Sequence, residues 1–221
     1  MIDATLLVIA KAPVAGRVKT RLCPPCTPTQ AAAIAQAALR DTFAAVADTP
    51  VMRRLVVLDG DPPGWLPAGL ELETQRGDGL AERLAAAFEG CAGPAFLVGM
   101  DTPQVTPALL TDALRRLTAG GADAVLGPTR DGGYWGIGLR RRAPEVFTGV
   151  PMSTPRTLAA QTARLAEAGL RPQTLETLED VDTIEDALRV AATAPTTRFA
   201  AALSESGHVA DGQQPVPEAA A

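Results

Sequence analysis

Residues 4–22 read ATLLVIAKAPVAGRVKTRL, and they decide the architecture expected for the chain. Residues 4–10 form an apolar, partly β-branched run that is typical of a buried strand. Residues 11–22 contain one glycine and four basic residues, and an alanine-rich stretch follows them. A strand, a basic loop and a helix in this order are suited to phosphate groups, because free backbone N–H groups and cations gather at the loop.

The basic loop, residues 11–22, contains both lysines of the chain, Lys11 and Lys19, whereas all other basic residues are arginine. Lysine is a compact point charge and arginine a planar fork, so the two are not interchangeable. The loop lacks the glycines that a Walker A motif places before its lysine, so we do not expect a P-loop kinase. The alternative to phosphate binding is an ordinary solvated loop. We expect the loop to bind a di- or triphosphate through Lys11, Gly16, Arg17, Lys19 and Arg21.

The length and charge of the chain limit its class. With 221 residues, of which 47% are hydrophobic, the chain can bury the core of one domain. Its net charge is −5, so no overall basic field attracts nucleic acid or an anionic membrane. No apolar run approaches the ~20 residues of a membrane span, and the first residues lack the basic segment of a signal peptide. We therefore expect a cytoplasmic protein.

Strand-like and helix-like stretches alternate along the chain. Strands are expected at residues 4–10, 54–58, 70–74, 95–100, 122–126 and 134–139, and helices at 29–47, 79–89, 106–118, 154–168 and 184–192. This alternation predicts an α/β fold with a mixed, mostly parallel sheet flanked by helices, in one Rossmann-like domain over residues 1–195. Ligands of such folds gather at the carboxyl ends of the strands. Residues 196–221 are rich in Ala, Pro, Ser, Gly and Gln, and we expect them to form a disordered tail.

The three cysteines, Cys23, Cys26 and Cys91, cannot form a closed set of disulfides. Cys23 and Cys26 have the spacing of a redox pair but do not begin a helix. A zinc site that adds Cys91 and His208 would need ligands scattered over the chain. We interpret all three as ordinary thiols of a reducing compartment.

An acidic residue, Asp101, follows the strand expected at residues 95–100. Pro103 then prevents the strand from continuing its hydrogen bonds. Asp101 is thus expected at the carboxyl edge of the sheet, where a Mg²⁺ or Mn²⁺ ion bound to phosphates takes one or two carboxylates. The alternative is that Asp101 only caps the next helix, although Thr106 suits that position better.

Residues 127–139 read GPTRDGGYWGIGL and combine an acid, two aromatic rings and several glycines. Asp131 and Gly132 alone are compatible with a simple hairpin turn. Flat rings beside open glycine backbone also suit a sugar or a base. On this second interpretation the substrate contacts are Asp131, Gly132, Gly133 and Tyr134.

Residues 75–83 begin a helix after a strand. Gln75 and Gly77 are expected to contact a nucleotide, with the Gln75 amide reading the edge of a base. The alternative is a plain loop in which Asp78 caps the helix.

Residues 178–186 place Asp180 and Asp182 directly after a short strand. Thr183 and Asp186 fit a capping box at the start of a helix. One of the two earlier acids is still free to face a metal ion, and we assign Asp182 as the second metal ligand beside Asp101.

Four of these segments together resemble those of the nucleotide-diphospho-sugar transferase superfamily, which has the GT-A fold. They are residues 11–22, 99–103, 127–138 and 180–183, and the resemblance runs over about residues 4–190. More closely, the set is similar to small bacterial proteins labelled radical-SAM/selenodomain-associated transferases or arsenosugar-biosynthesis glycosyltransferases. The resemblance implies phosphate contacts by Lys11, Lys19 and Arg21, metal binding by Asp101 and a substrate role for Asp131. Lys19, Asp101 and Asp131 are therefore the candidate catalytic residues.

Three functions remain open from the sequence. The first is a metal-dependent glycosyltransferase that takes a nucleotide-diphospho-sugar, a small-molecule acceptor and Mg²⁺ or Mn²⁺. The second is a nucleotidyltransferase, in which an acceptor phosphate attacks a nucleoside triphosphate and pyrophosphate leaves onto the basic loop. The third is a nucleotide-binding protein without turnover. The family resemblance favours the first function, whereas the four cations of the basic loop slightly favour the second.

Overall fold

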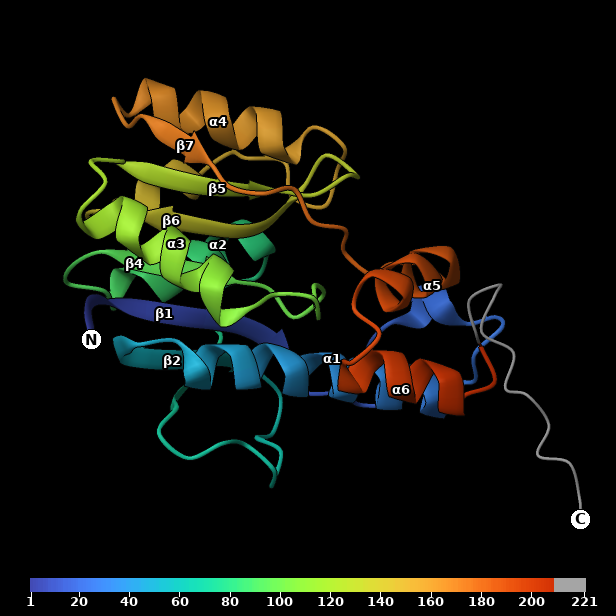
Figure 1. Ribbon diagram of the computed structural model, residues 1–221. Helices are drawn as coiled ribbons and strands as arrows, with labels where there is room; N and C mark the ends of the chain where they lie inside the picture. Colours follow the sequence, from blue (N-terminus) through green and yellow to red (C-terminus); the bar gives the residue numbers. More distant parts are fainter. Residues whose placement is uncertain (209–221) are drawn as a thin grey trace, which may run out of the picture.

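A computed structural model describes residues 1–208 of the protein (Figure 1). Within these residues seven strands form one sheet in the order β3-β2-β1-β4-β6-β5-β7. Neighbouring strands run parallel, except that β6 is antiparallel to both β4 and β5. The strands are β1 (Ile2–Lys11), β2 (Val51–Asp59), β3 (Glu71–Thr74), β4 (Ala95–Val98), β5 (Ala124–Pro128), β6 (Tyr134–Leu139) and β7 (Pro172–Thr174). The expected α/β fold with a mixed, mostly parallel sheet is confirmed.

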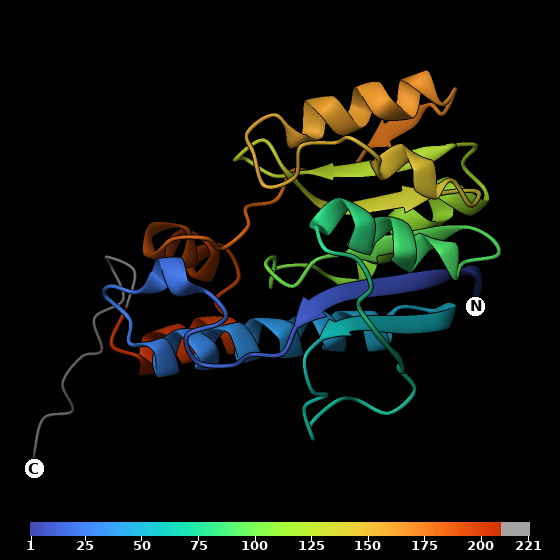
Figure 2. The ribbon, with the colours of Figure 1, turned by 180° about the vertical axis from the view of Figure 1, so that it is seen from behind.

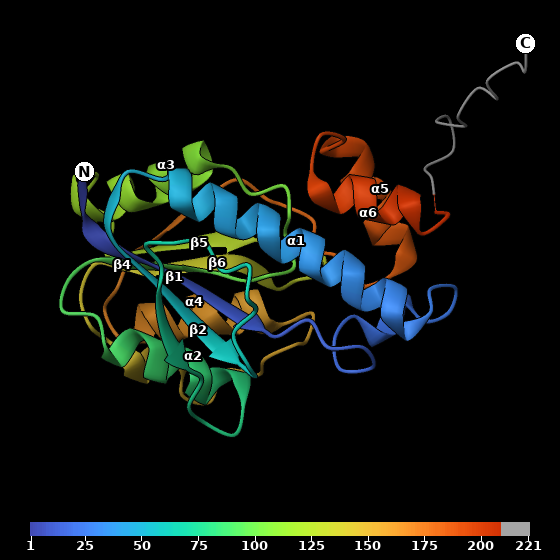
Figure 3. The same cartoon turned by 90° about the horizontal axis from the view of Figure 1, so that it is seen from below.

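Helices cover both faces of this sheet (Figures 2 and 3). One face packs against α1 (Pro28–Asp48) and α3 (Pro107–Thr118), and the other against α2 (Leu80–Glu89), α4 (Thr157–Glu167) and the short 3-10 helix η2 (Pro144–Phe147). The remaining helices lie beyond the sheet, beside the first half of α1. They are η1 (Thr20–Leu22), α5 (Ile184–Thr193) and α6 (Arg198–Glu205). None of the helices in residues 1–208 has the length and apolar character that a membrane crossing requires.

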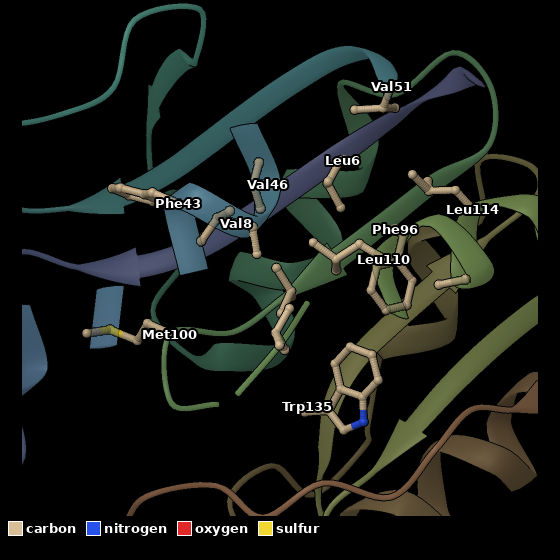
Figure 4. Packing of buried hydrophobic residues seen from close by; sticks show 14 of the residues in the cluster. Leu6, Val8, Phe43, Val46, Val51, Phe96, Met100, Leu110, Leu114 and Trp135 are labelled. Carbon is tan, nitrogen blue, oxygen red and sulfur yellow. The ribbon is translucent and has the colours of Figure 1, made fainter. Parts of the chain in front are cut away.

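Strand β1 contributes to the cores on both faces of the sheet. Leu6 and Val8 point towards α1 and α3, and Leu7 points towards α2, because successive side chains of a strand alternate between faces. Leu6 and Val8 belong to the same packed cluster as Phe43 and Leu110 (Figure 4). A strand buried on both faces has no polar side, which explains the continuous apolar run at residues 4–10.

The expected elements are present with small shifts in their bounds. Helices α1 and α5 begin at complete capping boxes, in which Thr27 and Thr183 are the N-caps. Helix α3 has Thr106 as its N-cap, so Asp101 is not the cap of that helix. Strand β4 ends at Val98, and the chain turns before it reaches Asp101. Strand β7 was not expected from the sequence, because three residues are too few to show an alternating pattern.

The folded structure continues past the domain boundary expected at residue 195. Helix α6 follows it, and its Phe199 and Leu203 are buried against α1 and α5. The hydroxyl of Thr197 caps this helix by accepting a hydrogen bond from the N–H of Ala200, at 3.1 Å. The alanine-rich composition conceals a helix that buries only two large side chains. The rest of the expected tail, residues 209–221, lies outside the described residues.

A third hydrophobic cluster, here called the outer cluster, joins α5 and α6 to the basic loop. It consists of Leu22, Cys26, Ala31, Ile34, Ala38, Val181, Ala187, Val190, Phe199 and Leu203. Leu22 lies at the end of the basic loop and is fully buried in this cluster. The cluster therefore anchors the segment that carries Lys19 and Arg21.

Candidate functional site

A cleft of about 580 Å³ opens at the carboxyl ends of β1 and β4. The strand order reverses at this point, since β2 and β3 lie on one side of β1 and β4 lies on the other. Such reversals form the crevice in which ligands of open α/β sheets bind. The predicted site residues that line the cleft are Lys11, Arg17, Lys19, Arg21, Gln75, Asp101, Tyr134 and Asp182. Five other predicted residues of the described chain are outside this lining: Gly16, Gly77, Asp131, Gly132 and Gly133.

Lys19 is the most enclosed cation of the basic loop. Its side chain is 7% exposed, and its ammonium nitrogen lies 2.5 Å from Oδ1 of Asp101. The same nitrogen donates a hydrogen bond to the carbonyl oxygen of Val181. The backbone of Lys19 has φ 49° and ψ 37°, in the left-handed region that residues other than glycine seldom adopt. The fold thus brings Lys19 and Asp101, two predicted catalytic residues, into direct contact.

A second ion pair lies beside the first. Nη1 of Arg21 is 2.7 Å from Oδ2 of Asp182, and both side chains are well exposed. Lys11 and Arg17 also line the cleft, and both residues are exposed. The basic loop therefore presents two cations that are paired with carboxylates and two that face the cleft and solvent.

Gln75 has a structural task that the sequence does not show. Its amide NH₂ donates to the carbonyl oxygens of Ala10 and Val57, at 2.7 and 3.2 Å. Its amide oxygen accepts from Nη1 of Arg83 at 2.9 Å, and the same Nη1 donates to Asp59 at 2.8 Å. Both donors of Gln75 are occupied, so only one acceptor lone pair of its amide remains for a ligand. Its predicted role in reading a base stays a prediction.

Two aromatic residues at the start of β6 differ in their surroundings. Trp135 is 3% exposed, donates its indole N–H to the carbonyl oxygen of Glu176 at 2.9 Å, and packs edge-on against Phe96. Trp135 is therefore packed into the core, although part of the residue also borders the cleft. Tyr134 lines the cleft, and burial raises the pKa of its hydroxyl, so this group stays protonated and acts only as a hydrogen-bonding group.

The turn between β5 and β6 explains the glycines predicted as substrate contacts. Asp131 accepts hydrogen bonds from the hydroxyl of Thr129 at 2.5 Å and from the N–H of Gly133 at 2.9 Å. Gly132 has φ 90°, and a side chain there would overlap the backbone of Pro155. In this structure the turn uses Asp131, Gly132 and Gly133 for its own geometry. Their predicted contacts with a substrate stay predictions.

The acidic residues create a negative field at the sheet edge. The pKa of Asp180 is raised to about 6, first because the carboxyl group is buried and second because Asp131 and Asp182 lie near it. Within residues 1–208, however, no three acidic, cysteine or histidine side chains converge to hold a metal ion by themselves. Asp101 and Asp182 both line the cleft, and a Mg²⁺ ion usually takes one or two carboxylates and completes its shell with substrate phosphates and water. The two residues therefore fit a Mg²⁺ or Mn²⁺ ion that arrives with a phosphate-bearing substrate.

The three cysteines are free thiols. Burial raises the pKa of both Cys26 and Cys91, which makes them poor nucleophiles. Cys26 lies 3.9 Å from Nδ1 of His208, but these residues and the other cysteines form no metal-binding group within the described chain. Neither the redox pair nor the zinc site has support in this arrangement.

Sequence reasoning missed several residues of the cleft. The base of α2 contributes Gly79, Leu80 and Arg83, and a distant loop contributes Ser153. Ser153 has φ 57°, and no local sequence motif predicts this left-handed conformation. Arg83 could have been predicted as a cleft residue, because it lies on the expected helix 79–89 and close in sequence to Gln75, which was predicted as a nucleotide contact.

The fold is similar to the folds of several solved structures. The fold matches that of a protein described as a "putative nucleotide-diphospho-sugar transferase" from Desulfovibrio desulfuricans G20, with TM-score 0.82 and 27% identity over 94% of this chain and 96% of that chain. Two nucleotide enzymes are similar in fold alone. CMP:2-keto-3-deoxy-manno-octonic acid synthetase complexed with CTP has TM-score 0.58 and 14% identity, over 87% of this chain and 98% of that one. The 2-C-methyl-D-erythritol 4-phosphate cytidylyltransferase from Thermus thermophilus has TM-score 0.53 and 17% identity, over 88% of this chain and 100% of that one.

Residues 31–154 match the family described as "Uncharacterized protein conserved in bacteria (DUF2064)", and the chain belongs to this family. No curated protein matches the sequence. The expected likeness to the nucleotide-diphospho-sugar transferases is confirmed at the level of fold. The narrower likeness to radical-SAM-associated and arsenosugar proteins stays a prediction.

Proposed function

We propose that the protein is a transferase that binds a nucleotide-activated donor in the cleft, with the phosphates of the donor against the basic loop. One observation carries the proposal: four cations of this loop and two carboxylates, Asp101 and Asp182, line the same cleft at the carboxyl edge of the sheet. The cations suit phosphates, and the carboxylates suit a divalent ion that accompanies them. The likeness to a nucleotide-diphospho-sugar transferase candidate and to a CTP-binding synthetase supports this assignment.

Glycosyl transfer is the reaction that we propose first. An acceptor hydroxyl oxygen bonds to C1 of the sugar and gives up its proton to solvent, the bond from C1 to the diphosphate breaks, and a nucleoside diphosphate leaves. Negative charge grows on the leaving diphosphate, and the cations of Lys19 and Arg21 stabilise it where it develops. Asp101 and Asp182 would hold a Mg²⁺ or Mn²⁺ ion, which would neutralise further charge on the same group.

Nucleotidyl transfer is the second candidate, and the number of cations on the basic loop favours it. In this reaction an acceptor oxygen bonds to the α-phosphorus of a nucleoside triphosphate, and the bond to the β-phosphate breaks. The leaving pyrophosphate carries more charge than a nucleoside diphosphate does. A loop with four basic residues matches that greater charge.

A thermal-shift experiment with Mg²⁺ or Mn²⁺ and a panel of nucleoside triphosphates and nucleotide-diphospho-sugars tests the proposal. A ligand at about 100 times its Kd raises the free energy of unfolding by about 2.7 kcal/mol, which is readily measured. Product analysis then separates the reactions, because glycosyl transfer releases a nucleoside diphosphate and nucleotidyl transfer releases pyrophosphate. Binding without either product would indicate a nucleotide-binding protein, and no shift with any ligand would contradict the proposal.

The variant Asp101→Asn sharpens this test. It removes the carboxylate that faces the cleft, so we expect it to stay folded and to lose the metal-dependent part of the nucleotide shift. Asp112→Asn is the matched control, since Asp112 is also about half exposed and paired with a basic residue, Arg116, but lies on α3. It should bind nucleotides as the parent does. A parent-like metal-dependent shift in Asp101→Asn would show that the site is misplaced.

A further inference from the structure

We propose that Lys19 takes the place of the divalent ion at Asp101 in the ligand-free protein, and leaves it when phosphates draw the ammonium group away. The inference rests on the proposed function and adds to it the order in which the metal ion and the nucleotide bind. The metal ion alone is excluded from the site, and it binds together with the nucleotide.

The surroundings of Lys19 are those of a cation site. Its ammonium nitrogen contacts one carboxylate oxygen, from Asp101, and one carbonyl oxygen, from Val181. Carboxylate and carbonyl oxygens are the hard ligands that Mg²⁺ and Mn²⁺ take in proteins. The side chain of Lys19 is 7% exposed and that of Asp101 is 47% exposed, so the ammonium is enclosed while the carboxylate still faces the cleft.

The second candidate metal ligand is engaged in the same way. Arg21 lies 2.7 Å from Asp182, so each carboxylate expected to hold the ion is paired with a cation of the basic loop. Like charges at such distances repel each other strongly where water is partly excluded. A free divalent ion therefore competes with Lys19 for the carboxylate of Asp101.

The backbone directs Lys19 towards this position. Its left-handed conformation begins η1, and its carbonyl oxygen accepts from the N–H of Leu22 at 3.0 Å. Leu22 is buried in the outer cluster. Lys11, the other lysine of the basic loop, is exposed, and no ion pair joins it to another residue in the described range 1–208. The position of Lys19 is thus built by the fold, whereas the ammonium of Lys11 is left to solvent.

A polyphosphate competes with both carboxylates for their cationic partners. Its oxygens offer Lys19 and Arg21 more negative charge than one carboxylate gives each of them. When the two side chains turn to the phosphates, Asp101 and Asp182 become free for the ion. Binding of the metal ion and of the nucleotide is then positively coupled, and each strengthens the other by the same factor.

Binding of Mn²⁺ in the absence of nucleotide, followed by electron paramagnetic resonance of the free ion, tests the proposal. Lys19→Met removes the ammonium and keeps an unbranched side chain, so we expect the affinity for Mn²⁺ to rise by at least about tenfold over the parent. Adding Asp101→Asn to Lys19→Met should abolish this gain. Arg116→Met is the matched control: Arg116 also pairs with a carboxylate, that of Asp112, but lies on α3 outside the cleft lining, so the affinity should change by less than about threefold. Equal affinities in the parent and in Lys19→Met would overturn the proposal.

Two additions keep the result decisive. Lys19→Gln keeps a hydrogen-bond donor near Val181 and replaces Lys19→Met if the latter does not fold. A nucleotide arm repeats the Mn²⁺ titration of the parent with a nucleoside triphosphate or a nucleotide-diphospho-sugar, and we expect a higher Mn²⁺ affinity there. If nucleotides bind but Lys19→Met gains no Mn²⁺ affinity, the exchange of cations is wrong and the proposed function stands. If no nucleotide binds the parent, the proposed function fails, and the nucleotide-free titrations still decide the role of Lys19.

Discussion

The sheet and the outer cluster place their parts of the site by different means. In the sheet, most strands and helices carry their own periodic apolar pattern, and Asp101 lies three residues after the end of β4. In the outer cluster, single side chains from distant segments meet, and the contact from Lys19 to Val181 spans 162 residues of sequence. The carboxylate of the site is thus placed by local pattern, and its closest cation by long-range packing. If this contrast is correct, a substitution in the outer cluster should weaken ligand binding in the cleft more than an equally destabilising substitution in the sheet.

The largest expected effect comes from emptying the outer cluster. Phe199→Ala should lower the free energy of unfolding by about 3–5 kcal/mol, because a fully buried phenylalanine leaves a cavity when it is truncated. Phe147→Ala is the matched control, since Phe147 is equally buried against Phe88 on one face of the sheet. Urea denaturation measures both losses.

The comparison also predicts a difference between these two variants. Under conditions where both are folded, Phe199→Ala should lose more of the nucleotide-induced stabilisation than Phe147→Ala, because it loosens the anchor of the basic loop. A loss of less than about 1 kcal/mol in Phe199→Ala would make the outer cluster a weak attachment and break the comparison.

An intermediate effect is expected from exchanging one cation for another. Lys19→Arg keeps the charge but should lower kcat/KM by about a hundredfold, because an enclosed site for an ammonium group misplaces a planar guanidinium. Steady-state kinetics check this, and Lys11→Arg should lower the rate less because Lys11 is exposed. A fall mainly in kcat would favour nucleotidyl transfer, and a rise mainly in KM would favour a loop that only holds a sugar donor. Parent-like kinetics in both variants would show that the two lysines do not contribute to the site.

The smallest effect concerns two helix caps. Thr183→Ala and Thr106→Ala should each cost about 1 kcal/mol of stability, because both hydroxyls accept a backbone hydrogen bond at a helix start. Only Thr183→Ala should also weaken nucleotide binding. The capping residue Asp186 accepts from the N–H of Asp182 as well, at 3.2 Å, and so positions the second carboxylate. Equal nucleotide affinity in the two variants would separate the cap from the site.

Most of the sheet could be predicted from the sequence, because most strands and helices have a recognisable apolar pattern or cap. Residues 134–139 form β6 as expected, and α3 and α5 start at the predicted caps Thr106 and Thr183. Helix α6 was missed because its alanine-rich composition conceals its start at Thr197 and its two buried side chains. Fold and helix starts are local properties, whereas the docking of a short alanine-rich helix is not.

The site was predicted in part for the same reason. Lys19, Asp101 and Asp182 were assigned to one sheet edge, and they do line one cleft. The direct pairing of Lys19 with Asp101 could not be predicted, because it depends on a left-handed residue and a distant carbonyl oxygen. Gln75 and Gly132 have tasks inside the protein that depend on the backbone of Ala10 and Pro155, which no spacing in the sequence reveals.

The long reach of the outer cluster has a consequence for how the protein is made. A ribosome adds about 5–20 residues per second from the N-terminus, so β1 to β6 emerge before residues 181–203 exist. A nascent chain can begin to assemble its sheet while Lys19 still lacks Val181 and Leu22 still lacks Phe199. The cleft is therefore completed only near the end of translation, after residues 181–203 have been added.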